Sequence, residues 1–254
     1  MVIDSHAHLH FDRFEEDRDA VIERAHLAGV EGIVTIGTHL ESSQQALSLA
    51  QEHSSIYATA GVHPLAVERF EESHWDAFEQ MWRDPQIVGV GETGLDYYYT
   101  PETRALQLSL FERHLKAAAR HDLPIVVHIR DAFDDAFELL ESHLGPAGGI
   151  VHCFTGGPAE CQRALALGMY ISLSGIATFK SAKPLRTAVP MIPKDRLLVE
   201  TDSPYLAPVP HRGKRCEPSF VVDTAREVAR LREESFDELC AYTVHNTRTI
   251  FARM

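Results

Sequence analysis

The feature that most limits the fold of this chain is a regular alternation of short apolar runs with longer amphipathic segments, from one end to the other. The apolar runs are mostly uniform, which is typical of strands buried on both faces of a parallel sheet. Eight strands are predicted, at residues 2–4, 32–36, 56–60, 87–90, 124–127, 149–151, 170–173 and 197–199. The chain is therefore expected to be an α/β protein.

The segments between these strands have helical periodicity. Helices are predicted at residues 14–28, 42–52, 75–82, 104–121, 134–143, 159–167 and 183–191, the last with the weakest pattern. Eight β/α units in about 250 residues are typical of a closed (β/α)8 TIM-type barrel. An open doubly wound sheet is the alternative. Residues 204–218, with four prolines, predict a long loop, and residues 219–254 predict two C-terminal helices.

Length and composition agree with one folded unit. No linker rich in proline, glycine or serine interrupts the 254 residues, so we expect residues 1–254 to form a single domain. Hydrophobic residues at 44% and charged residues at 24% are ordinary for a globular protein. The net charge of −13 repels phosphate backbones overall, so contact with nucleic acid requires local basic patches or bound cations.

The cysteines and the N-terminus predict a cytoplasmic protein. No Cys-x-x-Cys pair occurs among Cys153, Cys161, Cys216 and Cys240, which favours a reducing compartment. No apolar run approaches the roughly 18 residues that span a bilayer, and no charged segment followed by an apolar one opens the chain. A cleaved leader would also remove His6, which is a candidate functional residue.

His6 and His8 lie two positions apart at the end of the first predicted strand. Because side chains alternate between the two faces of a strand, both imidazoles are expected on one side, roughly 6 to 7 Å apart. This spacing suits a single metal ion. A surface or core histidine pair without a metal is also compatible with the pattern.

Other potential ligands follow the later strands, where the active site of a β/α barrel lies. These strand ends carry His63, Glu92, His128, His152 and Asp202. The glycines around Glu92 let the backbone bend, and the two carboxylate oxygens could bridge two ions. Taken singly, Glu92 could instead be a turn residue in water, and His128 and His152 could be core histidines.

Together these side chains predict two metal sites that share one carboxylate. His6, His8, Glu92 and Asp202 are expected to bind one ion, and Glu92, His128 and His152 the second. Mixed imidazole and carboxylate ligands suit zinc, manganese or iron better than magnesium, but the sequence does not distinguish Mg, Mn and Zn. Two ions about 3.5 to 4 Å apart activate a hydroxide for displacement at phosphorus. Hydrolysis is therefore expected, with Glu92 and Asp202 as catalytic residues and Asp202 taking the proton.

Candidates for substrate binding lie beside this set. His63 could donate a hydrogen bond to a phosphate or could be a structural turn residue. Arg212 and Arg215 belong to the only dense basic run, residues 211–215, which follows Asp202. Arginine suits phosphate, although short charged runs are usually solvated. The three tyrosines at residues 97–99 could stack on a base or simply cover a loop.

The motifs at these positions resemble the TatD family of metal-dependent hydrolases and deoxyribonucleases, within the amidohydrolase-like barrels. They occur in the expected order over nearly the whole chain: DSHAHL at 4–9, GVHP at 61–64, GETGLDY at 91–97, PIVVHIR at 124–130, VHCF at 151–154, ETDSPY at 200–205, RGKR at 212–215 and NT at 246–247. As a set they are highly specific.

The resemblance implies a (β/α)8 barrel that cleaves DNA phosphodiesters, commonly as a 3′ to 5′ exonuclease on single strands or 3′ ends. It implies two metal ions, with Glu200 joining where a third is bound, and it gives the ligand roles to His6, His8, Glu92, His128, His152 and Asp202. Two departures lie near the expected substrate side. Cys216 stands where asparagine is usual, and Thr155-Gly156-Gly157 replaces the common Ser-Gly-Ser.

Other functions are compatible with the same candidate ligands. Amidohydrolases of small esters, lactones or cyclic amides often bridge their metals with a carbamylated lysine after strand four, where this chain has Glu92; no lysine lies near a strand end before Lys180. A phosphatase of another histidine-rich fold is a third possibility, and a non-catalytic binding protein would be expected to lose ligands. We therefore expect a deoxyribonuclease that uses a metal-activated hydroxide in DNA repair or degradation. The sequence gives no oligomeric state.

Overall fold

In the computed structural model, which describes residues 1–254, eight parallel strands form one sheet in which each strand pairs with the next along the chain. The strands are β1 (Val2–Ala7), β2 (Val30–Ile36), β3 (Ile56–Ala60), β4 (Ile87–Asp96), β5 (Ile125–Arg130), β6 (Gly149–Val151), β7 (Tyr170–Leu173) and β8 (Leu197–Val199). A parallel bridge between Ala7 and Ser203 brings the two edges together. The sheet is thus a nearly closed barrel, and the open doubly wound alternative, which needs a non-sequential strand order, is excluded.

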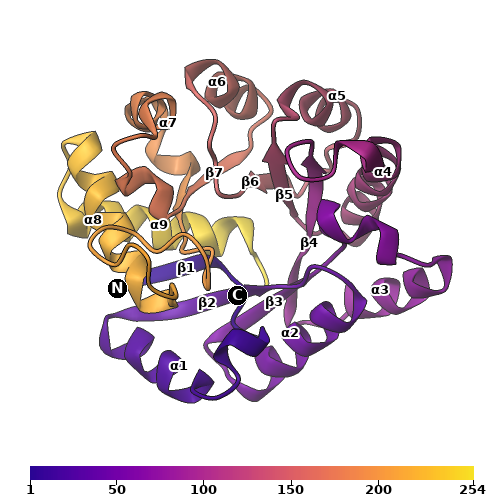
Figure 1. Ribbon diagram of the computed structural model, residues 1–254, viewed down its shortest axis with the longest axis horizontal. Helices are drawn as coiled ribbons and strands as arrows, with labels where there is room; N and C mark the ends of the chain where they lie inside the picture. Colours follow the sequence, from indigo (N-terminus) through magenta and orange to yellow (C-terminus); the bar gives the residue numbers. More distant parts are fainter.

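Helices form an outer ring around the strands (Figure 1). The α-helices are α1 (Arg18–Leu27), α2 (Leu40–Glu52), α3 (Trp75–Met81), α4 (Arg104–His121), α5 (Phe133–His143), α6 (Pro158–Ala166), α7 (Lys183–Ala188), α8 (Val221–Arg232) and α9 (Phe236–Ile250). Short 3-10 helices lie at η1 (Asp12–Phe14), η2 (Pro64–Arg69), η3 (Glu72–His74), η4 (Pro101–Thr103), η5 (Gly175–Thr178), η6 (Val189–Met191), η7 (Lys194–Arg196) and η8 (Pro218–Phe220). None of the helices is both long and apolar enough to cross a membrane.

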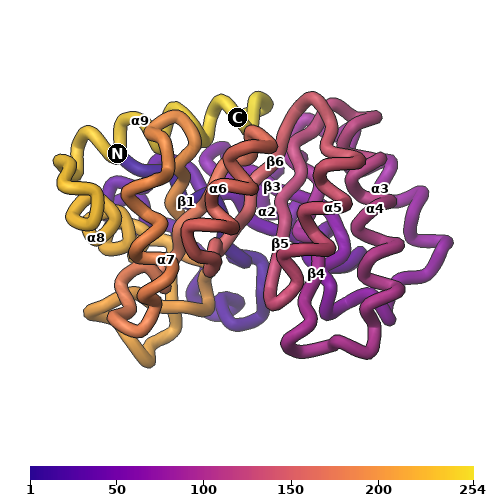
Figure 2. Tube along the Cα trace, turned by 90° about the horizontal axis from the view of Figure 1, so that it is seen from above, coloured from indigo at the N-terminus to yellow at the C-terminus, as the bar shows by residue number.

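The hydrophobic core has two parts. The larger lies mainly between the strands and the surrounding helices. The smaller fills the barrel with side chains from successive strands, and Ile250 and Phe251 at the end of α9 pack against it. Figure 2 shows α9 and the C-terminus along one end of the barrel. The polar side chains that follow the strands are therefore left to the opposite end.

Four of the predicted strands differ from the observed ones. The strands β1, β4 and β5 continue for three or more residues beyond their predicted ends, and β2 begins earlier. The predictions stopped where the apolar runs stopped. In the structure the polar residues that follow, such as Thr93 and His128, still take part in the ladder between β4 and β5. Glu92 therefore lies within a strand and not at its end.

Two predicted helices are wrong in extent. The predicted helix at 14–28 begins too early, because Phe14 is the buried last residue of η1 and α1 begins only at Arg18. The segment 183–191 is α7 followed by η6. Pro190 lies in η6, and because proline has no backbone N–H it interrupts the α-helical hydrogen bonding at that point. All four cysteines are free thiols.

Candidate metal centre

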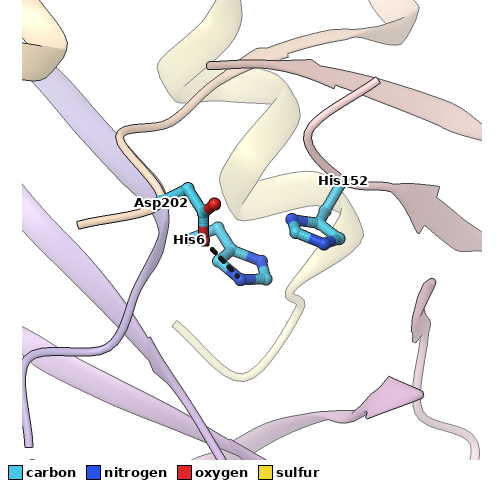
Figure 3. A group of neighbouring side chains, drawn as sticks. All are labelled: His6, His152 and Asp202. Atoms are coloured by element: carbon cyan, nitrogen blue, oxygen red, sulfur yellow. Dashed lines mark ion pairs between the residues drawn. The ribbon is translucent and has the colours of Figure 1, made fainter. Parts of the chain in front are cut away.

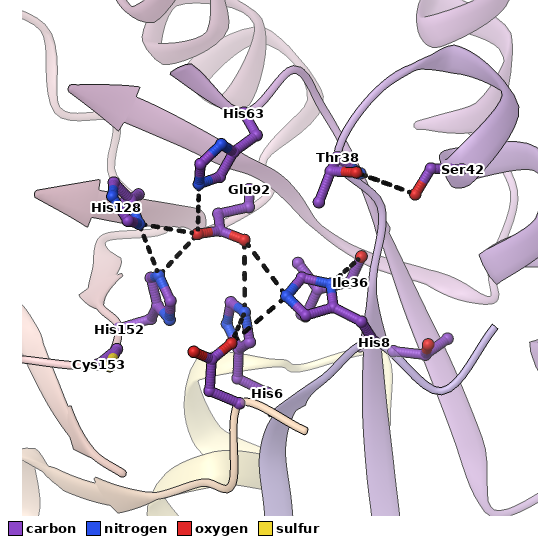
Figure 4. A network of polar contacts seen from close by, with 12 residues as sticks. His6, His8, Ile36, Thr38, Ser42, His63, Glu92, His128, His152 and Cys153 are labelled. Atoms are coloured by element: carbon purple, nitrogen blue, oxygen red, sulfur yellow. Dashed lines mark hydrogen bonds and ion pairs between the residues drawn. The ribbon is translucent and has the colours of Figure 1, made fainter. Parts of the chain in front are cut away.

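The carboxylate of Glu92 divides the histidines at the barrel mouth into two groups (Figure 4). Its Oε1 lies 2.7 Å from His152 Nε2, 3.1 Å from His128 Nδ1 and 3.3 Å from His63 Nε2. Its Oε2 faces the other pair, at 3.4 Å from His6 Nε2 and 3.8 Å from His8 Nε2. Each oxygen therefore belongs to a different cluster of nitrogen donors, which is the arrangement that a carboxylate shared by two cations requires.

Two glycines allow β4 to carry Glu92 into this position. Gly91 has a φ of 134°, and a Cβ atom there would meet the carbonyl oxygen of Val126 at 2.5 Å. Gly94 has a φ of 136° and passes beside the carbonyl of His128. Only glycine readily adopts this backbone conformation. The Gly-x-x-Gly spacing around Glu92 therefore lets β4 lie close against β5 while its carboxylate points into the mouth.

In His8 and His128, a hydrogen bond to one ring nitrogen determines which nitrogen is free to bind a metal. Nδ1 of His8 lies 2.9 Å from the carbonyl oxygen of Ile36 and must donate to it, so Nε2 keeps its lone pair. Nε2 of His128 lies 3.1 Å from Oδ2 of Asp96, which leaves the Nδ1 lone pair facing Glu92. Histidines that bind metals are commonly held by such partners, which fix the tautomer and the ring orientation.

His6 and His152 have ring nitrogens that no protein group satisfies. Both nitrogens of His6 and Nδ1 of His152 are buried without a hydrogen-bond partner. The two rings stack with centroids 3.9 Å apart. A buried polar atom left unpaired costs free energy, and natural proteins rarely tolerate several in one place. A cation between these rings and the carboxylates would satisfy them, so the residues present fit a divalent metal ion.

Asp202 reaches the cluster through the seam that joins β1 to β8. Its backbone N–H donates to the carbonyl of His6 at 2.9 Å, and the N–H of His8 donates to Ser203 at 2.7 Å. Its Oδ1 lies 3.4 Å from His8 Nε2 and 3.7 Å from His6 Nε2. Figure 3 shows Asp202 and His152 turned toward His6. The ligand atoms of these three residues lie within 4.8 Å of one another.

The electrostatics of the site favour positive charge. Burial by itself raises the pKa of Glu92, but the surrounding imidazoles outweigh it and hold that pKa well below its usual range. Burial likewise opposes ionisation of Asp202, yet its contact with His8 lowers the pKa. The pKa of His152 is raised well above its usual value because Glu92 outweighs the effect of burial. The same negative field would stabilise a divalent cation.

His63 joins the Glu92 cluster as a hydrogen-bond donor. Its Nδ1 accepts from the N–H of Leu65 at 3.1 Å, so the neutral ring carries its proton on Nε2, which points at Glu92. The ligand atoms of His63, Glu92 and His128 also lie within 4.8 Å of one another. His63 is thus placed where the sequence expects it, beside the centre and able to donate a hydrogen bond.

The two arginines of the basic loop lie in different surroundings. Arg212 is exposed, with its guanidinium 3.6 Å from the centre of the Phe179 ring. Arg215 is half-buried and bonds to both carboxylate oxygens of Asp17, at 2.8 and 2.7 Å. Arg215 would have to give up this pair to reach a phosphate. Cys216 is fully buried, and its backbone N–H donates to Pro204.

Sequence reasoning missed two carboxylates that organise the site, Asp4 and Asp96. Asp4 is fully buried in β1, and burial raises its pKa to about 8 against the effect of its hydrogen bonds to Thr201. Asp96 holds His128 from behind. Asp96 shares a period-two spacing with Glu92 in β4, and that spacing is the one signal that could have identified it. Glu200 is also buried, with Oε1 3.4 Å from His152 Nδ1 and Oε2 unpartnered.

Comparisons with known proteins agree with this architecture. The family model for TatD-related DNases matches residues 3–252. The chain is 37% identical to the uncharacterized metal-dependent hydrolase YabD of Bacillus subtilis, over 99% of both chains. It is also 37% identical to the 3′-5′ ssDNA/RNA exonuclease TatD of Erwinia amylovora, over 94% of this chain and 95% of that one. The crystal structure of the TatD homologue YjjV from Escherichia coli superposes with a TM-score of 0.95, at 32% identity and covering 99% and 98% of the two chains.

A parallel eight-stranded barrel with clustered histidines and carboxylates at the carboxyl ends of its strands defines a metal-dependent hydrolase acting on ester bonds. The match covers nearly the whole chain and includes all the residues of the cluster around Glu92. The chain belongs to the family of TatD-related DNases.

Proposed function

We propose that this protein is a metal-dependent deoxyribonuclease that removes nucleotides from the 3′ ends of single-stranded DNA. The observation that carries the proposal is the position of Glu92, whose two oxygens face separate groups of histidines. A relative at 37% identity is named a 3′-5′ ssDNA/RNA exonuclease, which supports a nucleic acid substrate. Residues 1–254 would act as one domain, and a cytoplasmic location stays a prediction.

Six side chains would hold two divalent ions, with Glu92 shared between them: His6, His8, Glu92, His128, His152 and Asp202. Glu200 is the candidate ligand for a third. When bound, the ions would activate a water molecule and neutralise charge on the phosphate. The buried, unpaired nitrogens of His6 support this assignment most directly.

Asp202 would serve as the general base. Its Oδ1 faces the rings of His8 and His6, so Oδ2 is the oxygen that would accept the proton of the attacking water. His63 would donate its Nε2 proton to a phosphate oxygen, since its Nδ1 is already an acceptor. Arg212, exposed in the loop after β8, would bind a neighbouring phosphate, and Arg215 would assist once released from Asp17.

The test is cleavage of a 5′-labelled single strand in the presence of Mg2+, Mn2+ or Zn2+. Progressive shortening from the 3′ end, lost in EDTA and restored by added metal, is expected. Asp202→Asn should lower kcat by about 10²- to 10⁴-fold, the usual contribution of a general base. Asp195→Asn makes the same chemical change at an exposed position and should leave the rate unchanged.

Two results would contradict the proposal. One is cleavage that survives both EDTA and Asp202→Asn. The other is faster turnover of small lactones than of DNA or nucleotide phosphodiesters, which would favour an amidohydrolase of small esters on the same barrel. Comparison of single-stranded, duplex and abasic DNA in the same assay shows which DNA structure the enzyme prefers. An RNA strand of equal length tests whether RNA is also a substrate.

A further inference from the structure

Exposed aromatic side chains occur at only one end of this molecule. Among the 2 Trp, 7 Tyr and 12 Phe residues, only Tyr98, Tyr99 and Tyr205 are exposed, at 58%, 58% and 46%. All three follow strands that contribute to the metal centre. Leaving a large aromatic ring in water forfeits the free energy of its burial, so a cluster of exposed rings points to a binding surface.

The first pair lies directly beyond β4 and is here called the β4 platform, Tyr98 and Tyr99. The two rings meet edge to face with centroids 4.8 Å apart. The guanidinium of Arg130, at the end of β5, lies 4.0 Å from the centre of one ring and 4.6 Å from the other. The platform is tied to the metal centre by Asp96. Its Oδ1 accepts the N–H groups of both tyrosines, while its Oδ2 contacts His128.

The second ring, the β8 platform, is Tyr205. Its backbone N–H donates to the carbonyl of Asp202 at 2.9 Å, and its ring centroid lies 6.3 Å from that of His8. The guanidinium of Arg13, just beyond β1, lies 5.8 Å from the ring centre. Both platforms therefore pair an exposed tyrosine with an arginine, and both adjoin a candidate metal ligand.

The order of the strands puts the two platforms on opposite sides of the mouth. The barrel runs β1 to β8 in sequence, so the β4 and β5 ends lie across the barrel axis from the β8 and β1 ends. Glu92 and its histidines lie between them. A nucleic acid strand with one phosphate at the metal centre would therefore have a tyrosine ring beside the bases on each side of that phosphate.

We propose that the β4 and β8 platforms stack the unpaired bases that flank the phosphate held at the metal centre. This inference rests on the proposed nuclease function and adds the feature that selects unpaired strands. Stacking needs bases that are free of a duplex, and every base offers a flat face. Arg13 and Arg130, which form no ion pairs, add positive charge beside the phosphates, unlike Arg215, which is bound to Asp17.

The test compares an ordinary single strand with a strand of the same length whose 3′ segment carries abasic sites. Tyr205→Ala and the double variant Tyr98→Ala, Tyr99→Ala should each raise KM for the ordinary strand by roughly 5- to 100-fold, with kcat changed by less than about twofold. Tyr→Phe variants at the same positions should retain wild-type KM. None of these variants should change KM for the abasic strand.

Binding is measured separately by fluorescence anisotropy in an Asp202→Asn background, where cleavage is slow. Leu27→Ala removes an exposed apolar side chain from the C-terminal end of α1, at the barrel end opposite the mouth, and is the control for surface changes away from the mouth. Alanine variants that bind the ordinary strand as the wild type does, or that weaken ordinary and abasic strands equally, would overturn the stacking inference. A wild-type protein that cleaves neither strand would overturn the proposed function instead.

Discussion

Oδ2 of Asp96 lies 3.1 Å from Nε2 of His128, and this contact decides which nitrogen of the ring faces the metal centre. The carboxylate can only accept, so Nε2 carries the proton and Nδ1 presents a lone pair toward Glu92. The other oxygen of Asp96 accepts the N–H groups of Tyr98 and Tyr99. One carboxylate thus orients both a candidate ligand and the loop beside it.

Asp96→Asn should weaken metal binding without unfolding the protein. The amide oxygen can still accept from the tyrosine N–H groups, but its NH2 would face Nε2 of His128 and favour the tautomer with a proton on Nδ1. Loss of a ligand's supporting partner typically lowers metal affinity about 10- to 100-fold. Titration of the metal-free protein by calorimetry measures the change. Asp131→Asn alters an exposed carboxylate nearby, and an equal loss in that variant would contradict this explanation.

Thr201→Val should lower stability by removing the partner of a buried acid. The Oγ1 of Thr201 lies 2.6 Å from Oδ2 of Asp4, in a fully buried contact between β1 and the segment after β8. Valine matches the shape of threonine but cannot donate. An unsatisfied buried group costs about 1 to 3 kcal/mol, which urea unfolding would detect. Thr249→Val, on the exposed side of α9, is the control and should change little.

The sequence predicts the barrel because buried parallel strands have a plain apolar signature, and all eight strands occur near their predicted positions. Their ends were misjudged for a physical reason. The residues that extend β4, from Gly91 to Asp96, include polar side chains that a buried strand normally lacks, and they are kept there because the barrel mouth satisfies them. The polar residues of the candidate site thus interrupt the apolar pattern from which the length of a strand is predicted.

Features that depend on distant contacts were not predictable. The sequence predicts Asp4 only as an ordinary strand residue, because its hydrogen-bond partner Thr201 is 197 positions away. The sequence predicts Arg215 as an unpaired cation in a basic run, because the residues next to it give no sign of its ion pair with Asp17. The candidate ligands could be predicted from the sequence because each lies at or shortly after the end of an apolar run. The groups that orient them could not be, since hydrogen-bond partners across a barrel leave no periodic signal.

Arg212→Ala should weaken DNA binding more than Arg215→Ala does. Arg212 is exposed and stacked on Phe179, so it can bind a phosphate without breaking an ion pair. Each phosphate contact to a single strand contributes about −0.7 to the slope of log K against log salt. Loss of Arg212 should reduce the slope by about that amount. Anisotropy at several salt concentrations measures it. A larger loss for Arg215→Ala would mean that Arg215 leaves Asp17 when DNA binds.

His114 should make the fold sensitive to acid. It is fully buried on α4, where Nδ1 donates to the carbonyl of Leu110, and Nε2 has no partner. Burial lowers its pKa from 6.5 to about 4, so the unfolded chain binds the proton more readily than the native state. The contribution of neutral His114 to the free energy of unfolding is therefore fully present above pH 6.5 and is lost as the pH drops toward 4. The loss is about 2 kcal/mol between pH 7 and pH 5.

His114→Leu removes this titration while keeping an apolar group among Trp75, Phe78 and Trp82. Other groups also titrate in this range, so the useful quantity is the difference in unfolding free energy between variant and wild type, measured in metal-free buffer at both pH values. That difference should shift by about 2 kcal/mol in favour of the variant as the pH falls from 7 to 5. His245→Leu, at an exposed site on α9, is the matched control. A constant difference would show that His114 accepts a proton without unfolding, through a local opening between α3 and α4.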